Sequence, residues 1–131
     1  MTNHELMQQY RTTVLDLQEL EVQLNRAIRS GRPSDVRSPS FDHTPGTNDP
    51  VAASMQEADG LEAMIVRKRS ELAEMAMSIG QVMAKISGFR TFMVVQQYYL
   101  QASTDAQIGL RLGLSRARVN QIRLDWAAQA G

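Results

Sequence analysis

The chain has 131 residues, with 14 basic and 14 acidic side chains and no cysteine. That length suits one compact domain or a small domain joined to an extended helical arm. The lack of cysteine excludes a disulfide framework and any thiolate metal or redox site. The two histidines lie in different segments without ligand-like spacing, and Asp42-His43 has no nearby nucleophile. We therefore expect no metal site, no cofactor, no catalytic residues and no enzymatic activity.

The N-terminus has no basic segment followed by an apolar stretch, so it does not resemble a signal peptide. No apolar run approaches the ~20 residues needed to span a bilayer. We expect a soluble cytoplasmic protein without a membrane partner.

The first segment, residues 1–30, predicts one long helix over about 3–29. Its apolar side chains recur at alternating steps of four and three, which keeps them on one face of an α-helix. Gly31 and Pro33 end the pattern. The line consists of Leu6, Tyr10, Thr13, Leu17, Leu20, Leu24 and Ala27.

Residues 31–50 hold all four prolines and many Ser, Asp, Thr and Gly residues. This composition predicts a Pro/Ser-rich linker or long loop without a regular element. Its length exceeds the ~12–15 residues usual for structureless loops. We therefore expect it to be partly disordered or to lie along a neighbouring surface.

Residues 51–86 predict a second, longer helix with the same alternation, in which only Lys68 is not apolar. Sustained heptads on both helices favour a coiled-coil-like pairing, most simply as an antiparallel hairpin. The pattern does not decide between this hairpin and a dimer, and a homodimer through the helical arm is also expected. The line consists of Ala58, Leu61, Ile65, Lys68, Leu72, Met75, Ile79, Val82 and Ile86.

A second line of small residues occupies another face near the end of this helix. Small side chains let another helix approach closely, so we expect packing there, either by the C-terminal module or by a second chain. The small residues are Ala73, Ala76, Gly80 and Ala84. After Ser87-Gly88, the segment from Phe89 to Leu100 predicts a third helix, along which five residues recur at steps of three and four. These residues are Phe89, Phe92, Met93, Gln96 and Tyr99.

The segment from Ser103 to Arg123, within a module over residues 87–131, meets the demands of a helix-turn-helix. Two short helices that cross steeply need a small residue at the crossing and a turn residue that tolerates positive φ. Gly109 and Gly113 stand at those two places. Ser115 can cap the second helix, and Ser103 or Thr104 the first. The core positions are Ile108, Leu112, Leu114, Val119 and Ile122.

Ser115 to Gln129 would then be a recognition helix that meets base edges in the major groove of double-stranded DNA. Arginine can pair with guanine, and Asn or Gln with adenine, so Arg116, Ala117, Asn120 and Gln121 are expected to face the bases. Arg118 and Arg123 suit phosphates, as do helix N-termini. Residues 87–131 carry five arginines against two aspartates, and no acid lies between Ser115 and Leu124. The plainer alternative is that the two helices only pack a core. The candidate DNA-binding residues are Thr104, Ser115, Arg116, Ala117, Arg118, Asn120, Gln121 and Arg123.

The stretch from Phe89 to Trp126 resembles the promoter-binding C-terminal region of bacterial sigma factors. Residues 104–109 (TDAQIG), 115–122 (SRARVNQI) and 97–100 (QYYL) carry the likeness. In layout, the whole chain resembles small phage and prophage regulators of the ArpU and RinA type. This resemblance implies a sigma-like activator of phage genes. Ala117 departs from the acidic residue usual in sigma factors, so a different base preference is expected, because alanine offers only an apolar contact, for example to a thymine methyl.

Three functions are thus compatible with the sequence. The first is a sequence-specific DNA-binding transcription regulator, encoded by a phage or prophage. The second is an interaction protein that acts on RNA polymerase or another regulator. The third is a small DNA-packaging subunit, which also combines such a module with helical oligomerisation.

Overall fold

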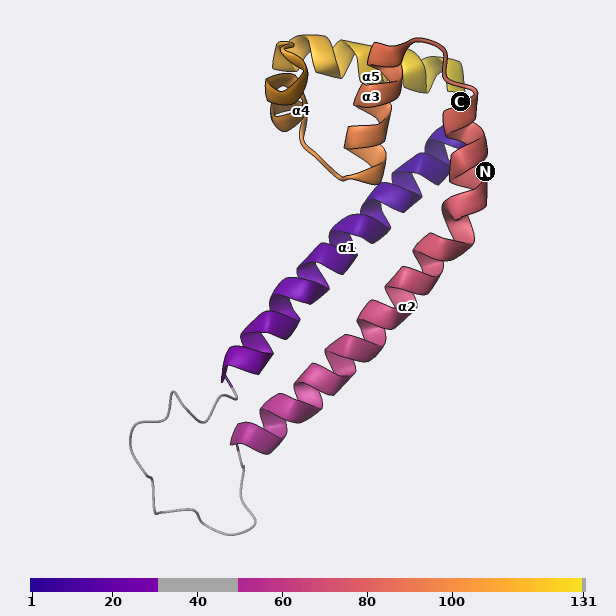
Figure 1. The fold of residues 1–131 in the computed structure, drawn as a ribbon. Helices are drawn as coiled ribbons and strands as arrows, with labels where there is room; N and C mark the ends of the chain where they lie inside the picture. Colours follow the sequence, from indigo (N-terminus) through magenta and orange to yellow (C-terminus); the bar gives the residue numbers. More distant parts are fainter. Residues whose placement is uncertain (31–49, 131) are drawn as a thin grey trace. The chain divides into compact units, whose positions relative to one another are not determined.

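The computed structural model describes residues 1–30 and 50–130, and these residues form helices and contain no strand. The all-α fold class is therefore confirmed. The predicted linker lies outside the described residues except for Pro50. Within the two described ranges, no helix has both the length and the apolar character needed to cross a membrane. The elements are α1 (Asn3–Ser30), α2 (Pro50–Ala84), α3 (Phe89–Val95), the π-helical turn η2 (Gln96–Leu100), α4 (Asp105–Leu112) and α5 (Arg116–Ala130) (Figure 1).

The long helix α1 starts at a reciprocal pair of side-chain hydrogen bonds. The Thr2 hydroxyl accepts from the Glu5 backbone N–H at 3.1 Å, and the Glu5 carboxylate accepts from the Thr2 N–H at 3.2 Å. This capping box satisfies two donors that the first turn of a helix leaves unpaired. It fixes the start of α1 close to the residue that the periodicity predicted.

The described helices divide into two compact units, of which the smaller is Leu17–Arg67. Its core joins α1 and α2 through leucines, an isoleucine and alanines. Leu20, Ala27, Leu61 and Ile65 are buried, and Leu17, Leu24 and Ala58 pack against them. All seven belong to the two apolar lines predicted from the sequence, so burial of apolar area holds these parts of α1 and α2 together.

The larger unit comprises Met1–Asp16 and Lys68–Gly131. One of its two cores gathers residues from α1, α2, α3, η2 and α5: Met7, Ile79, Val82, Met83, Val95, Tyr99 and Trp126. Lys68 breaks the apolar line of α2 without leaving its charge unpaired, because its ammonium lies 3.7 Å from Asp16 and 3.5 Å from Glu71. The start of α1 and the end of α2 therefore belong to the same folded unit as the C-terminal helices.

The helix α2 ends at Ala84, two residues before the predicted limit at Ile86. The backbone N–H groups of Lys85 and Ile86 bond to the carbonyls of Val82 and Met83, three residues back. Such bonds tighten the end of a helix and stop its propagation. Ile86 still packs against the core of the larger unit, so its apolar character reflects packing rather than helix length.

The inward side of α3 and η2 differs from the predicted one. The predicted spacing groups Phe89 with Tyr99, but Phe89 is 78% exposed whereas Tyr99 is fully buried. The helix packs on two sides: Val94 belongs to the core beneath α4 and α5, whereas Val95 and Tyr99 belong to the core shared with α1 and α2. The prediction of one inward face therefore misplaced Phe89, because a helix that is buried on two sides has no single apolar face.

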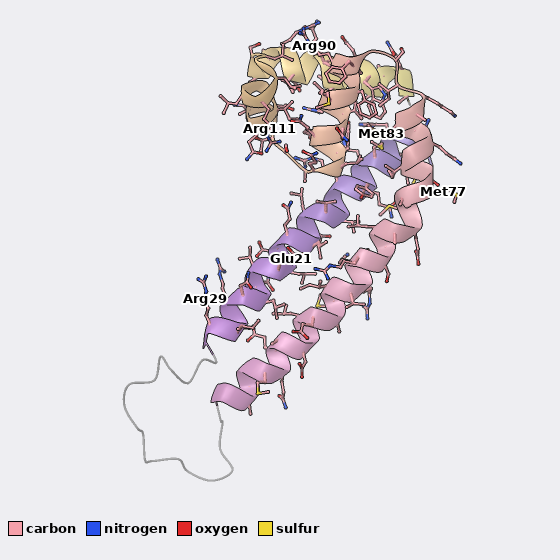
Figure 2. All side chains as sticks on the ribbon, in the orientation of Figure 1. Glu21, Arg29, Met77, Met83, Arg90 and Arg111 are labelled. Carbon is pink, nitrogen blue, oxygen red and sulfur yellow. The ribbon has the colours of Figure 1, made fainter. Side chains whose placement is uncertain are left out.

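The small-residue line of α2 is exposed. Ala73, Ala76, Gly80 and Ala84 all lie at the surface, and no atom outside the helix's own backbone lies within 4 Å of a β-carbon built at Gly80. Figure 2 shows Met77 of the same region pointing away from α1, whereas Met83 lies toward the core. Of the two expected partners for this line, the C-terminal module is excluded, because it packs on the other side of α2. A second chain stays a prediction.

Removal of the Tyr99 hydroxyl is expected to change the free energy of unfolding in the opposite direction to most substitutions in a core. Tyr99 is fully buried, its ring lies 5.5 Å from that of Trp126, and its hydroxyl has no hydrogen-bond partner among the described residues. Burial raises the pKa of Tyr99 and outweighs the opposing effect of the nearby Arg123 guanidinium. That guanidinium directs its hydrogen bonds to Asp105 and Asn120, so it leaves the Tyr99 hydroxyl unpaired within the described part of the chain. We expect Tyr99→Phe to leave the free energy of unfolding unchanged or raise it by about 1 kcal/mol, because it removes an unpaired buried group. Urea denaturation measures this; a clear loss of stability in Tyr99→Phe would contradict it.

Candidate nucleic-acid interface

The helix α4 is capped at both ends by residues that the sequence singled out. The Thr104 hydroxyl accepts from the Gln107 backbone N–H at 3.2 Å, and the Gln107 side chain accepts from the Thr104 N–H at 3.0 Å. At the other end, Gly113 has φ 69° and ψ 34°, in the left-handed region. Glycine occupies that region at no steric cost and so ends the helix.

The close approach of the turn to α4 depends on Gly109. Gly109 is buried, and its carbonyl accepts a hydrogen bond of 2.9 Å from the backbone N–H of Leu114. A β-carbon at Gly109 would lie 2.5 Å from the carbonyl oxygen of Leu114, far inside the 3.5–4.0 Å of an ordinary contact. The chain after α4 can therefore fold back onto it only because residue 109 lacks a side chain.

The helix α5 begins after a serine cap and packs on α4 and α3. The Ser115 hydroxyl accepts from the Arg118 backbone N–H at 3.0 Å. Beneath the helix lies the second core of the larger unit, formed by Val94, Ile108, Val119 and Ile122 with Tyr98, Leu112 and Leu114 at its edge. Four of the five predicted core positions of the module lie in α4 or α5 and the fifth, Leu114, in the turn, and all five take part in this core.

The outward side of the first two turns of α5 is polar and carries no acid. Arg116, Ala117, Arg118 and Gln121 are exposed. The Arg116 side chain has no hydrogen bond or ion pair with any described residue, and Arg118 donates to the Gln121 side-chain oxygen at 3.0 Å. Thr104 and Ser115 are also exposed, but their hydroxyls are engaged as helix caps. The four exposed side chains at the start of α5, Arg116, Ala117, Arg118 and Gln121, are together called the α5 face.

Arg123, predicted to contact phosphate, is instead held inside the unit. Its Nε and one terminal nitrogen donate to the two carboxylate oxygens of Asp105 at 3.2 and 2.9 Å. The same terminal nitrogen donates to the Asn120 side-chain oxygen at 2.7 Å, and the guanidinium lies 4.1 Å from the ring centre of Tyr98. Both charged side chains are largely covered, at 15% and 17% exposure. The bridge ties the start of α4 to the middle of α5.

Electrostatics around this bridge favour the charged guanidinium. Burial acts to lower the pKa of Arg123. The Asp105 carboxylate, together with Tyr98 and Tyr99, raises it above its ordinary value. The contact also changes what Asn120 presents. Because its side-chain oxygen already accepts from Arg123, its amide N–H groups remain to act as donors. Asn120 is thus better suited to an acceptor than to the paired donor and acceptor of adenine.

Two further arginines, whose roles sequence patterns did not indicate, connect distant segments of the larger unit. Arg11 of α1 donates to the Tyr98 backbone carbonyl at 3.0 Å and lies 4.1 Å from the Tyr98 ring centre. Arg111 of α4 donates to the Ser103 hydroxyl at 2.8 Å and to the side-chain oxygen of the buried Gln97 at 3.3 Å. These contacts hold α4 and α1 against the turn η2.

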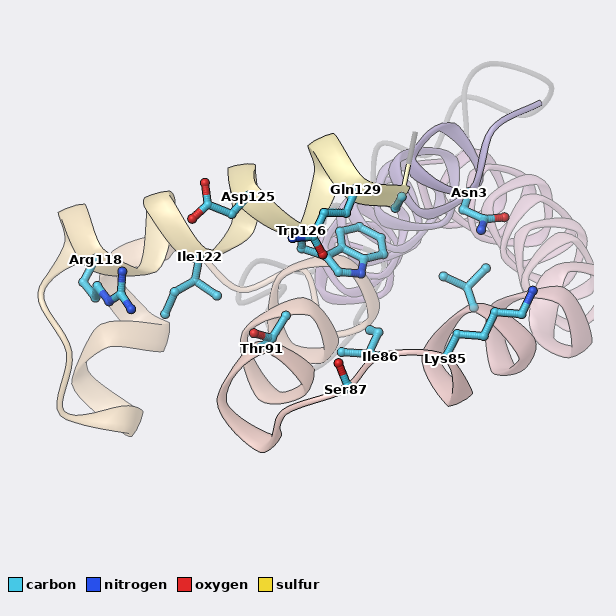
Figure 3. A pocket seen from close by; sticks show the side chains of 12 residues that line it. Asn3, Lys85, Ile86, Ser87, Thr91, Arg118, Ile122, Asp125, Trp126 and Gln129 are labelled. Carbon is cyan, nitrogen blue, oxygen red and sulfur yellow. The ribbon is translucent and has the colours of Figure 1, made fainter.

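A groove of about 590 Å³ runs beside α5, on a different side from Arg116. Figure 3 shows the Trp126 ring in its middle and the cations Arg118 and Lys85 at opposite ends, with Asp125 on the rim. Its charges are dispersed and mixed in sign. The groove therefore does not form a concentrated anion site, and the α5 face remains the candidate interface.

Comparisons with protein-family models, with curated proteins and with solved structures found no match to this chain.

Proposed function

We propose that this protein is a sequence-specific DNA-binding regulator of transcription, with α4 and α5 as a helix-turn-helix. The observation that carries the proposal is the α5 face: Arg116, Ala117, Arg118 and Gln121 at the start of a helix, exposed and without an acid. The helix that carries this face is fixed against α4 by helix caps, a glycine turn and a shared core. A rigid helix that exposes its N-terminal side chains suits the major groove.

In this proposal, Arg116 and Gln121 read base edges and Ala117 contacts an apolar base group. Arg116 is the strongest candidate, because its guanidinium is exposed and can offer two donors to guanine. Asn120 reads a base acceptor through its remaining N–H groups. Arg118 and the capped starts of α4 and α5, at Thr104 and Ser115, lie toward phosphates.

The resemblance of residues 89–126 to the promoter-binding end of sigma factors supports the same proposal. It also supports a phage or prophage regulator that activates genes. We further propose that α1 and α2 form an antiparallel helical hairpin that serves as the arm of this regulator. The shared core of Leu20, Ala27, Leu61 and Ile65 supports the pairing.

The test is the base preference of Arg116→Ala. DNA bound by the full chain is first selected from a random pool, and affinities are then measured by gel shift at fixed salt. We expect Arg116→Ala to weaken the selected site by about 1–3 kcal/mol, which is about 5-fold to 150-fold, and to relax the choice of one base pair.

Arg90→Ala is the matched control, because it removes the same charge from an exposed arginine of α3, outside the α5 face. We expect the control to keep the base preference of the parent chain. Equal affinity of the parent chain for all DNA sequences would contradict the proposal. So would equal weakening by Arg116→Ala and Arg90→Ala without any change in base preference.

A further inference from the structure

The helix α2 carries a second heptad line, on the side opposite the apolar line that runs from Ala58 to Ile86. Starting at position 63, its members recur at alternating steps of three and four, and none is charged. Helical periodicity alone places them on one face, because α2 is continuous from Pro50 to Ala84. The line, which we call the outer line, consists of Ala63, Val66, Ser70, Ala73, Met77, Gly80 and Ala84.

Every member of the outer line is exposed, and the two largest are the most unusual. Val66 is 62% exposed and Met77 is 78% exposed. Single exposed apolar residues are common, but a repeat of three and four over three heptads is the pattern of a helix that pairs with another helix. Among the described residues, no other element covers this side of α2.

The charges beside the outer line match a second copy of the same helix. Glu62 and Arg69 flank the line on one side, and Arg67 and Glu74 flank it on the other. In a parallel two-stranded coiled coil, each residue on the first flank faces the residue five positions further along on the second flank of the other helix. Glu62 would then face Arg67 of the partner subunit, and Arg69 would face Glu74 of the partner subunit.

We propose that two copies of this chain associate through the outer lines of α2 as a parallel, in-register pair. Each of the flanking contacts joins opposite charges, and symmetry forms each contact twice. A shift by one heptad would set Glu62 against Glu74 of the partner subunit and Arg67 against Arg69 of the partner subunit, so like charges oppose the shift. The small side chains of the line allow the two backbones to come close.

An antiparallel pair of the same lines is less well matched. When the side chains of two antiparallel outer lines interdigitate, Arg67 can face Glu74 of the partner subunit. Glu62 and Arg69 then face uncharged side chains. A parallel pair also brings both α5 faces to the same end of the dimer. This last point rests on the proposed function, since a dimer that reads two half-sites needs both recognition helices on one side.

The mass of the full chain, measured without DNA by light scattering over a range of concentrations, tests the pair separately from DNA binding. We expect a concentration-dependent rise toward twice the chain mass of 14.6 kDa. Met77→Glu should weaken the association at least 10-fold, because it places charges in the paired face. Met64→Glu is the matched control on the same helix, where Met64 is 46% exposed but lies outside the outer line, and it should leave the association unchanged.

Orientation is tested by Ala63→Cys, which introduces the only thiol into a chain without cysteine. Oxidation should cross-link two copies in the parallel pair, whereas the antiparallel pair would separate the thiols by about 26 Å along the helices. A parent chain that stays monomeric, or a dimer that Met77→Glu leaves intact, overturns the proposal. A dimer that Ala63→Cys fails to cross-link overturns the parallel arrangement.

Discussion

Gly109→Ala is expected to destabilise the larger unit by about 2–3 kcal/mol. In a solvent-exposed helix this change would stabilise by about 1 kcal/mol, because alanine is the better helix former. At Gly109 the new methyl group would lie 2.5 Å from the Leu114 carbonyl oxygen. Relief requires moving a backbone that is held by the Leu114 N–H bond to Gly109 and by the left-handed Gly113. Forced overpacking of this kind commonly costs 1–3 kcal/mol or more, so the steric term exceeds the propensity gain.

Gly60→Ala supplies the control for Gly109→Ala. Gly60 lies within α2, and no atom outside the helix's own backbone lies within 4 Å of a β-carbon built there. We expect Gly60→Ala to raise stability by about 0.5–1 kcal/mol from helix propensity alone. Both variants are measured on the full chain by denaturant unfolding with circular dichroism. A stabilising effect of Gly109→Ala equal to that of Gly60→Ala would show that α4 does not need a glycine at the turn.

The parts of the fold that the sequence predicted well rest on interactions within a few residues. Thr104 with Gln107, Gly113 and Ser115 each act over at most four positions, and the structure places all of them at helix ends as caps. The apolar lines of α1 and α2 were likewise readable, because helical periodicity is a property of the local chain. Most of the described helices could therefore be outlined from spacing alone.

The interactions that sequence reasoning missed join residues far apart in the chain. Arg123 and Asp105 are 18 positions apart, and Arg11 and Tyr98 are 87 positions apart. No pattern of spacing links such pairs, because their proximity follows from how the helices pack. An arginine side chain can also bind either a phosphate or a carboxylate. Composition alone could therefore not separate Arg123, which is bridged to a carboxylate, from Arg116, which is exposed and unpaired among the described residues.

The candidate site is accordingly narrower than the set of residues predicted for it. Thr104 and Ser115 use their hydroxyls as caps, so only their place at helix starts is available to a phosphate. Asn120 has its oxygen occupied by Arg123. The structure brings the predicted residues of α5 onto one helix, but it divides them into side chains that face solvent and side chains that hold the helices together.

This division leads to a prediction for Arg123, in which Arg123→Met and Asp105→Asn each destabilise the larger unit by about 2 kcal/mol. Removing one partner of a fully buried pair costs about 3–5 kcal/mol, and the 15% and 17% exposure of these side chains reduces that loss. The double variant should be little worse than either single variant. A coupling energy of about 1–2 kcal/mol in a double-mutant cycle, measured by denaturant unfolding, would establish the bridge as structural.

The same two variants distinguish a structural Arg123 from one that contacts phosphate. If Arg123 bound phosphate, Asp105→Asn would free its guanidinium and remove a negative charge, so the affinity for DNA would rise. Arg123→Met would then lower the dependence of affinity on salt by about one phosphate contact. We expect neither change under conditions where both variants are folded. Arg118→Ala, at an exposed arginine near the start of α5, should instead reduce the salt dependence without loss of stability. Tighter DNA binding by Asp105→Asn would assign Arg123 to the interface and leave the contact between α4 and α5 to their shared core.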